Sequence, residues 1–221
     1  EEQAPNIFVT ISSELVPKWG EYERTTATAL NAYIGPLTSG YLGRLGRTVE
    51  EMDNPNPMQI TQCGGGTISL KRGRSAPLLT LDSGPVSGVT GSRYLGGLMG
   101  IANIITTDMG GTSFDVGIIH EGHPAFSYVS NVNQYEYFLP KVDIQAIGNG
   151  GGSLVRADER TRTLHVGPES AGADPGPVCY GRGGLVPTVT DAALVLGYIG
   201  TSSFADGRVK LDKQAAEVAI K

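Results

Sequence analysis

The 221-residue chain has 39% hydrophobic residues, 18% charged residues and a net charge of −5 at pH 7. These values suit a globular protein and exclude a strongly basic surface for nucleic acid. We find no signal peptide and no apolar run long enough to cross a bilayer, so we expect no membrane partner. Cys63 and Cys179 lack the spacing of metal ligands, which predicts a reduced, cytoplasmic setting.

The first third of the chain alternates predicted strands and helices. From Glu21 to about Glu51, apolar residues recur at spacings of three and four, which predicts a helix. Gly35-Pro36 is expected to break or kink this helix. Strands are expected, from their β-branched and apolar runs, at 6–11, 58–62 and 78–82, with a basic turn at 71–75.

A helix built from small residues is expected over 84–100, directly after the 78–82 strand. Ser83-Gly84-Pro85 would open it, and a helix N-terminus that follows a strand can bind an anion. Serine and glycine are poor helix formers, so close packing against another element is an equally good explanation. Ser83 and Gly84 are therefore candidate substrate or cleft residues.

The chain is organised around residues 103–119, NIITTDMGGTSFDVGII. Two β-branched runs flank the turn Gly110-Gly111-Thr112-Ser113, which predicts strand, tight loop and strand. Glycines can adopt positive φ, so the turn could point successive N–H groups at an anion, with Thr112 and Ser113 adding hydroxyl donors. An ordinary hairpin with a glycine-rich turn is the alternative.

Carboxylates stand at both ends of this loop, at Asp108 and Asp115. A carboxylate does not contact a phosphate without a cation or water between them, so we expect Mg²⁺ held by Asp108 through water. The loop is no P-loop, because Gly-Lys-Ser/Thr is absent, and no G-x-G-x-x-G opens a helix. The pattern predicts a phosphate-binding loop on a hairpin.

A second glycine cluster lies at 139–153, LPKVDIQAIGNGGGS. Asp143 lies in a strand-like run, and one turn does not require the four glycines that follow it. Close approach of the backbone to a ligand or to another backbone explains them better than a flexible connector does. The glycines are Gly148, Gly150, Gly151 and Gly152.

The last third is expected to hold a hairpin at 154–166, an ordered loop at 167–184 and a helix over 188–199. Three prolines make the loop rigid. Thr190-Asp191 resembles a helix cap. Cys179 has no histidine near it in sequence, so a packed structural cysteine is a better interpretation than a nucleophile.

Several motifs, in this order, resemble the hydantoinase A/oxoprolinase family within the actin/sugar-kinase/Hsp70 ATPase superfamily. They are EYERTTATALNAYIGPL, SGPVSGVTGSRYLGG, TTDMGGTSFDVGII, VDIQAIGNGGGSL, GPESAGADPGPVCYGRGG and PTVTDAALVLGYI. The resemblance covers most of the chain, and the motifs together are far more specific than any one of them.

This resemblance implies an α/β chain with a partial actin-like (ribonuclease H-like) ATPase fold, a mixed sheet with packed helices. It implies ATP and Mg²⁺ as cofactors, phosphorylation of a substrate carbonyl oxygen, and a hydantoinase B-type partner. Asp108 and Asp115 would be catalytic through Mg²⁺ and water. Gly110–Ser113 would bind phosphate, while Asp143 and the glycines of 148–152 would line the cleft opposite.

The sequence also departs from the family pattern. An earlier D-x-G-G-T motif and a later Gly-Gly-Ala-Gly-Pro-like motif are absent, and Gln145 stands where many relatives have histidine. The chain has no initial Met and closes inside an apparent helix. We therefore expect residues 1–221 to be the central part of a hydantoinase A/oxoprolinase domain that binds ATP poorly alone.

Three functions remain open from the sequence. The first is an ATP-dependent hydrolase acting on cyclic amides of the hydantoin or 5-oxoproline type. The second is an ATP-dependent ketone carboxylase subunit, of the acetone or acetophenone type. The third is an actin-like nucleotide switch or scaffold without a small-molecule substrate.

Overall fold

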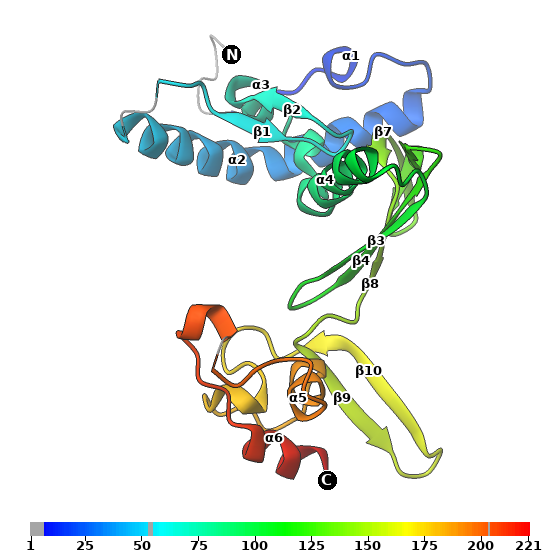
Figure 1. Cartoon of the computed structure of the whole chain (residues 1–221). Coiled ribbons are helices and arrows are strands. Elements are labelled where there is room, and N and C mark those ends of the chain that lie inside the picture. The colour runs from blue at the N-terminus through cyan, green and yellow to red at the C-terminus, as the bar shows by residue number, and fades with distance from the viewer. Residues whose placement is uncertain (1–6, 53–54, 203) are drawn as a thin grey trace. The chain divides into compact units, whose positions relative to one another are not determined.

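The structure, a computed structural model, describes residues 7–52, 55–202 and 204–221. Helices and short antiparallel sheets alternate along the chain (Figure 1), so the α/β class expected from the sequence is confirmed. The chain forms two compact units. One holds the residues up to Thr106 together with Gly117–Ile144, and the other holds Thr107–Val116 with Gln145–Lys221. No helix in the described ranges is both long and apolar enough to cross a membrane.

The first unit is built on a long helix that small elements cover. Its helices and first strands are α1 (Ser12–Leu15), α2 (Glu21–Glu51), β1 (Gln59–Thr61), β2 (Thr67–Ser69), α3 (Leu70–Ser75), the 3-10 helix η1 (Pro77–Thr80) and α4 (Ser83–Met99). Figure 1 shows α3 alongside α2, and the β1–β2 hairpin contacts α3. A buried cluster that includes Ala27, Leu78 and Tyr137 forms the main core of this unit.

The predicted helix over 21–51 is confirmed. Of the two effects expected at Gly35-Pro36, the break is wrong, because α2 continues through Pro36 as one helix, and the kink stays a prediction. A proline inside a helix removes one backbone hydrogen bond and crowds the preceding turn. Packing offsets that cost here: Phe8 lies directly against Gly35, and Asn31 is fully buried. The Asn31 side chain donates to Thr10 Oγ1 at 2.9 Å and accepts from the Leu78 amide at 2.9 Å.

Two predictions between 70 and 82 are wrong. Residues 71–75 fall in helix α3, whose first turn Ser69 caps by accepting from the Arg72 amide. Residues 77–80 form the 3-10 helix η1 and not a strand, and the Leu78 amide donates to the Asn31 side chain of α2. At 7–11 the structure likewise assigns no strand, and residue 6 lies outside the described residues.

The remaining strands of the centre form two sheets. They are β3 (Ile104–Met109), β4 (Phe114–His120), β5 (His123–Pro124), β6 (Phe126–Val132), β7 (Tyr135–Val142) and β8 (Ile144–Ile147). One sheet has the order β3-β4-β5 with β8 also paired to β4, and β6 pairs with β7. The strand, loop and strand expected at 103–119 are confirmed. Asp143 interrupts the strand-like run in which the sequence placed it, since β7 ends before it and β8 begins after it.

The second unit packs a hairpin and short helices around a small core. Its elements are β9 (Ser153–Asp158), β10 (Thr163–Ser170), the 3-10 helices η2 (Val178–Tyr180) and η3 (Phe204–Gly207), α5 (Val189–Val195) and α6 (Lys213–Ile220). β9 and β10 form the predicted hairpin. Cys179, Leu194, Leu211 and Ala216 form the buried core.

Candidate functional site

The loop between β3 and β4 is closed by its own backbone. The Gly110 amide donates to the Ser113 carbonyl at 3.0 Å. The amides of Gly111 and Thr112 have no acceptor within the described part of the chain, and both residues are exposed. Neither Gly110 nor Gly111 has a positive φ, so that part of the expectation is wrong. The loop nevertheless presents two consecutive free N–H groups, which is the arrangement that suits an anion.

The second glycine cluster packs directly on this loop. The Gly151 amide donates to the Gly110 carbonyl at 2.9 Å, and the Gly152 amide donates to the Gly111 carbonyl at 2.7 Å. The two loops are 40 residues apart in sequence, and these bonds place their backbones side by side within the second unit. The carbonyls of Gly110 and Gly111 are therefore already hydrogen-bonded to the second glycine cluster.

The close approach explains why the second cluster consists of glycines. A β carbon on Gly150 would lie 2.6 Å from the Thr112 backbone, and one on Gly152 would lie 2.8 Å from the Gly111 carbonyl oxygen. Real β carbons essentially never come so near to another atom. A β carbon on Gly111, in contrast, meets no protein atom within 4 Å. The sequence predicted that the glycines allow close approach either to a ligand or to another backbone. At Gly150 and Gly152 it is another backbone.

Helix α5 fixes the second cluster in place. The Thr190 amide and hydroxyl both donate to the Gly151 carbonyl, each at 2.8 Å. The predicted helix cap is displaced by two residues, since the N-cap is Thr188, and Thr188 and Asp191 form a capping box. The spacing T-x-x-D could have located this N-cap from the sequence, because a capping box needs an acidic or amide side chain three residues after the cap.

Asp191 also holds the segment that precedes α5. Its carboxylate is fully buried and accepts from the Cys179 amide at 2.8 Å, the Val178 amide at 3.2 Å, and the Thr188 amide and hydroxyl at 2.8 Å each. Cys179 is fully buried in the core of this unit, which confirms a packed cysteine. Burial raises the pKa of its thiol to about 12, so it stays protonated and is a poor nucleophile.

A cavity of about 350 Å³ opens beside the two glycine loops. One side is glycine backbone, and the other is apolar, formed by α5 and by Tyr180 and Phe204, whose ring centroids are 5.6 Å apart. This combination of backbone polar groups and aromatic rings is typical of small-molecule sites. The lining residues are Met109, Gly110, Gly111, Gly151, Gly152, Gly172, Pro177, Tyr180, Val189, Thr190, Ala193, Ile199 and Phe204.

The two loop carboxylates have different surroundings. Asp115 accepts a hydrogen bond from the Ser113 hydroxyl at 2.9 Å, while Asp108 is exposed. No group of three metal-ligating side chains occurs among the described residues. Mg²⁺ with a nucleotide commonly takes one or two carboxylates, water and phosphate oxygens, so Asp108 alone would suit the water-mediated ion expected from the sequence.

The other sequence-predicted site residues fall in the first unit. Ser83 and Gly84 form the first turn of α4, whose N-cap is Asp82. The Asp82 carboxylate accepts from Lys141 Nζ at 2.8 Å. The Asp143 amide donates to the Ala125 carbonyl at 2.9 Å.

The second unit joins Gly110–Ser113 to Gly148–Gly152. The sequence analysis did not identify Tyr180, Thr190 and Phe204 as residues that line the cavity beside these loops.

Comparison with known proteins decides the family. A family model described as hydantoinase/oxoprolinase matches residues 24–221. The chain belongs to the hydantoinase/oxoprolinase family. It is 40% identical over 217 residues to caprolactamase subunit alpha of Pseudomonas jessenii, covering 98% of this chain and 31% of that protein. It is also 35% identical to the acetophenone carboxylase gamma subunit of Aromatoleum aromaticum, covering 96% and 29% respectively.

Two solved structures of family members have the same fold. Nucleotide-free acetone carboxylase matches with a TM-score of 0.81 at 35% identity, over 95% of this chain and 29% of that one. The ATP-dependent caprolactamase of P. jessenii matches with a TM-score of 0.77 at 38% identity, over 99% and 32%. The predicted fold class is thereby confirmed. The chain spans about a third of the length of these relatives.

Proposed function

We propose that the full-length protein is an ATP-dependent hydrolase of cyclic amides and that residues 1–221 supply one of its phosphate-binding loops. The observation that carries the proposal is the loop Gly110–Ser113, which is held against Gly150–Gly152 and leaves the amides of Gly111 and Thr112 free. The resemblance to caprolactamase, a relative named for a cyclic amide, supports the substrate class.

The residues would have separate roles in this reaction. The free amides and the Thr112 hydroxyl would bind phosphate oxygens, and Asp108 would hold Mg²⁺ through water. ATP would transfer its terminal phosphoryl group to the amide oxygen and leave ADP. Water would then attack the activated carbonyl carbon, the C–N bond would break with the amine leaving as a protonated group, and phosphate would be released from the acyl oxygen to give a carboxylate. Oriented N–H groups accelerate such steps by stabilising the charge that develops on phosphate oxygens.

The experiment uses the full-length protein together with its hydantoinase B-type partner subunit, which the family resemblance implies. Release of ADP with Mg²⁺ is measured against caprolactam, 5-oxoproline and hydantoins, each added alone. Stimulation by a cyclic amide supports the proposal. Asp108→Ala should lower this turnover by about 100-fold or more, and because Asp108 is exposed, the thermal stability should not change. If the Asp108→Ala variant kept its turnover, Asp108 would not belong to the phosphate-binding site.

A second candidate function is an ATP-dependent ketone carboxylase. The similarity to acetone carboxylase, at a TM-score of 0.81, favours it. Adding acetone or acetophenone together with bicarbonate as further arms of this assay separates the two enzymes, because the carboxylase would respond to these arms and not to a lactam alone. ADP release that no small molecule stimulates would contradict both and favour the nucleotide switch.

A further inference from the structure

The hairpin that joins β4 to β5 turns at Glu121-Gly122, and its backbone is held in place within the first unit. Both turn residues have positive φ, 50° at Glu121 and 77° at Gly122, as a two-residue turn of type I′ requires. The Glu121 amide donates to Asn103 Oδ1 at 2.9 Å, and the Gly122 amide donates to the Ala102 carbonyl at 2.7 Å. The turn is therefore tied by two hydrogen bonds to the segment that precedes β3.

Two histidines flank this turn and stand opposite each other across the hairpin. His120 is the last residue of β4, His123 is the first residue of β5, and the register makes them direct cross-strand partners. Such partners project from the same face of an antiparallel pair, with their β carbons about 5 Å apart. Both side chains are exposed, and they are two of the three histidines in the chain. Two imidazole rings can thus reach one ion from the same face.

The hydrogen bond of the His123 ring prepares it for a metal ion. Its Nδ1 lies 2.9 Å from the Glu121 carbonyl oxygen. A carbonyl oxygen only accepts, so Nδ1 carries the proton and Nε2 of the neutral ring keeps a free lone pair. Histidines that ligate metals commonly donate their other ring N–H to a backbone carbonyl in this way, which fixes the tautomer and the orientation of the ring. Here the turn itself supplies the carbonyl, so the ring is oriented before an ion binds.

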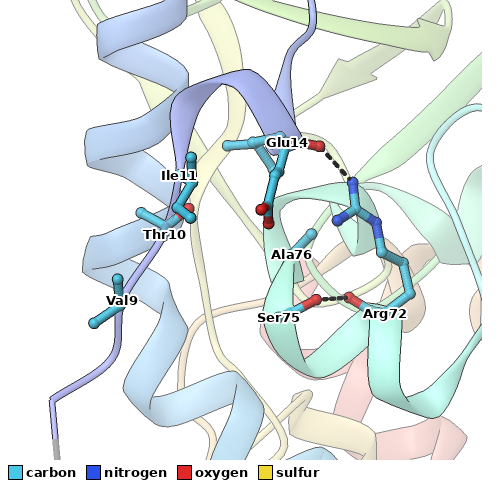
Figure 2. Close-up of a pocket in the computed structure, with 8 residues that line it drawn as sticks. Val9, Thr10, Ile11, Glu14, Arg72, Ser75 and Ala76 are labelled. Atoms are coloured by element: carbon cyan, nitrogen blue, oxygen red, sulfur yellow. Dashed lines mark hydrogen bonds between the residues drawn. The ribbon is translucent and has the colours of Figure 1, made fainter. Parts of the chain in front are cut away.

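The groove beside helix α3, in contrast, offers no ligand of this kind. It has a volume of about 420 Å³, and Figure 2 shows Val9, Thr10 and Ile11 on one side of it, with Ser75 and Ala76 on the other. Neither histidine nor cysteine is among its lining residues, and Cys63 is buried elsewhere in the same unit. Within the described residues of the first unit, the accessible imidazole and thiol groups are therefore the two histidines at the turn.

We propose that His120 and His123 form a two-histidine site for a divalent transition-metal ion that prefers imidazole, such as Zn²⁺. The ligands would be Nε2 of His123 and a ring nitrogen of His120, and water would fill the remaining positions of the ion. No group of three metal-ligating side chains occurs among the described residues, so we expect moderate affinity. The proposal is independent of ATP and of the phosphate-binding loop.

The first test is equilibrium dialysis of Zn²⁺ against the full-length protein without an affinity tag, in an excess of Mg²⁺, which prefers oxygen ligands. His120→Ala and His123→Ala should each weaken one Zn²⁺ site by about 10-fold or more. His165 is the matched control, because it is exposed but has Arg156 as its cross-strand partner, and His165→Ala should leave this site unchanged. Without metal, all three variants should melt like the wild-type protein, since the replaced side chains are exposed.

The outcome of the dialysis decides the proposal. Equal Zn²⁺ binding by the wild-type protein and the variants at the turn would show two exposed histidines without a metal and would overturn it. A loss in only one of the two variants would overturn it as well, because both rings are required to bind the same ion.

Chemical modification identifies the ligating rings in the wild-type protein. Diethyl pyrocarbonate modifies a ring nitrogen that has a free lone pair, and mass spectrometry of the peptides locates the product. Zn²⁺, but not Mg²⁺, should protect His120 and His123 together and leave the rate at His165 unchanged. Protection of neither residue at the turn, or equal protection of His165, would contradict the two-histidine site.

Discussion

A β carbon on Gly150 would lie 2.6 Å from both the backbone nitrogen and the carbonyl carbon of Thr112. The two loops of the candidate site can therefore touch only because residue 150 has no side chain. Gly150 does not have a positive φ, so lack of space, and not backbone conformation, requires glycine here.

Gly150→Ala should consequently separate the loops or strain them. We expect a loss of about 1–3 kcal/mol in the free energy of unfolding, as for other overpacked positions. Urea denaturation of the full-length protein measures it. Gly111→Ala is the matched variant, because its β carbon meets no protein atom. This second change should preserve stability but raise the KM for ATP if phosphate lies against Gly111. Equal stability of both variants would contradict the packing argument.

Thr190 couples helix α5 to the glycine loops through its amide and its hydroxyl, which both donate to the Gly151 carbonyl at 2.8 Å. Thr190→Val keeps the shape of the side chain and removes the donor. The expected cost is about 1 kcal/mol of unfolding free energy. Thr190→Ser retains the hydroxyl and should keep most of the stability. A serine variant as unstable as the valine variant would show that the methyl group, and not the bond, matters.

Asp191 should be the more sensitive of two helix-capping aspartates. Asp191→Asn replaces one acceptor oxygen by a donor while four donors point at the carboxylate, so we expect a loss of about 2–4 kcal/mol. Asp212 caps α6 in an exposed position, accepting from Ala215 at 2.9 Å. Asparagine caps as well as aspartate, so Asp212→Asn should be nearly neutral. Comparable thermal shifts for the two variants would refute this ranking.

The buried thiols should make stability fall at high pH. Burial raises the pKa of Cys63 to about 11 and that of Cys179 to about 12, from an ordinary 9.0. The unfolded chain loses these protons near pH 9 while the folded chain keeps them. The contribution of these neutral thiols to the free energy of unfolding is therefore complete below pH 9. It is lost as the pH rises from 9 toward 12.

Thiol labelling checks the same two cysteines. At pH 8 the folded protein should react with a disulfide reagent at least about 100-fold more slowly at these positions than the unfolded protein, because the thiols are neutral and covered. Single variants Cys63→Ala and Cys179→Ala assign the signals. Rapid labelling of the folded protein at either position would contradict the assigned burial.

Local signals in the sequence were enough for the elements that depend on short-range patterns. The helix over 21–51, the hairpin around Gly110–Ser113 and the hairpin of β9 and β10 follow from periodicity and turn residues. The excess of glycines at 148–152 correctly indicated close approach of a backbone. The family, too, was accessible, because several motifs in fixed order carry it.

The sequence alone could not determine which distant residues meet. The bonds from Gly151 and Gly152 to the first loop, the clamp by Thr190 and the aromatic wall of Tyr180 and Phe204 depend on contacts between residues that are far apart in sequence. The same is true of Leu78, which lies in the 3-10 helix η1 where the sequence predicted a strand, and whose amide donates to the buried Asn31 side chain. Local propensity is weak, and a single tertiary hydrogen bond to a buried amide can outweigh it.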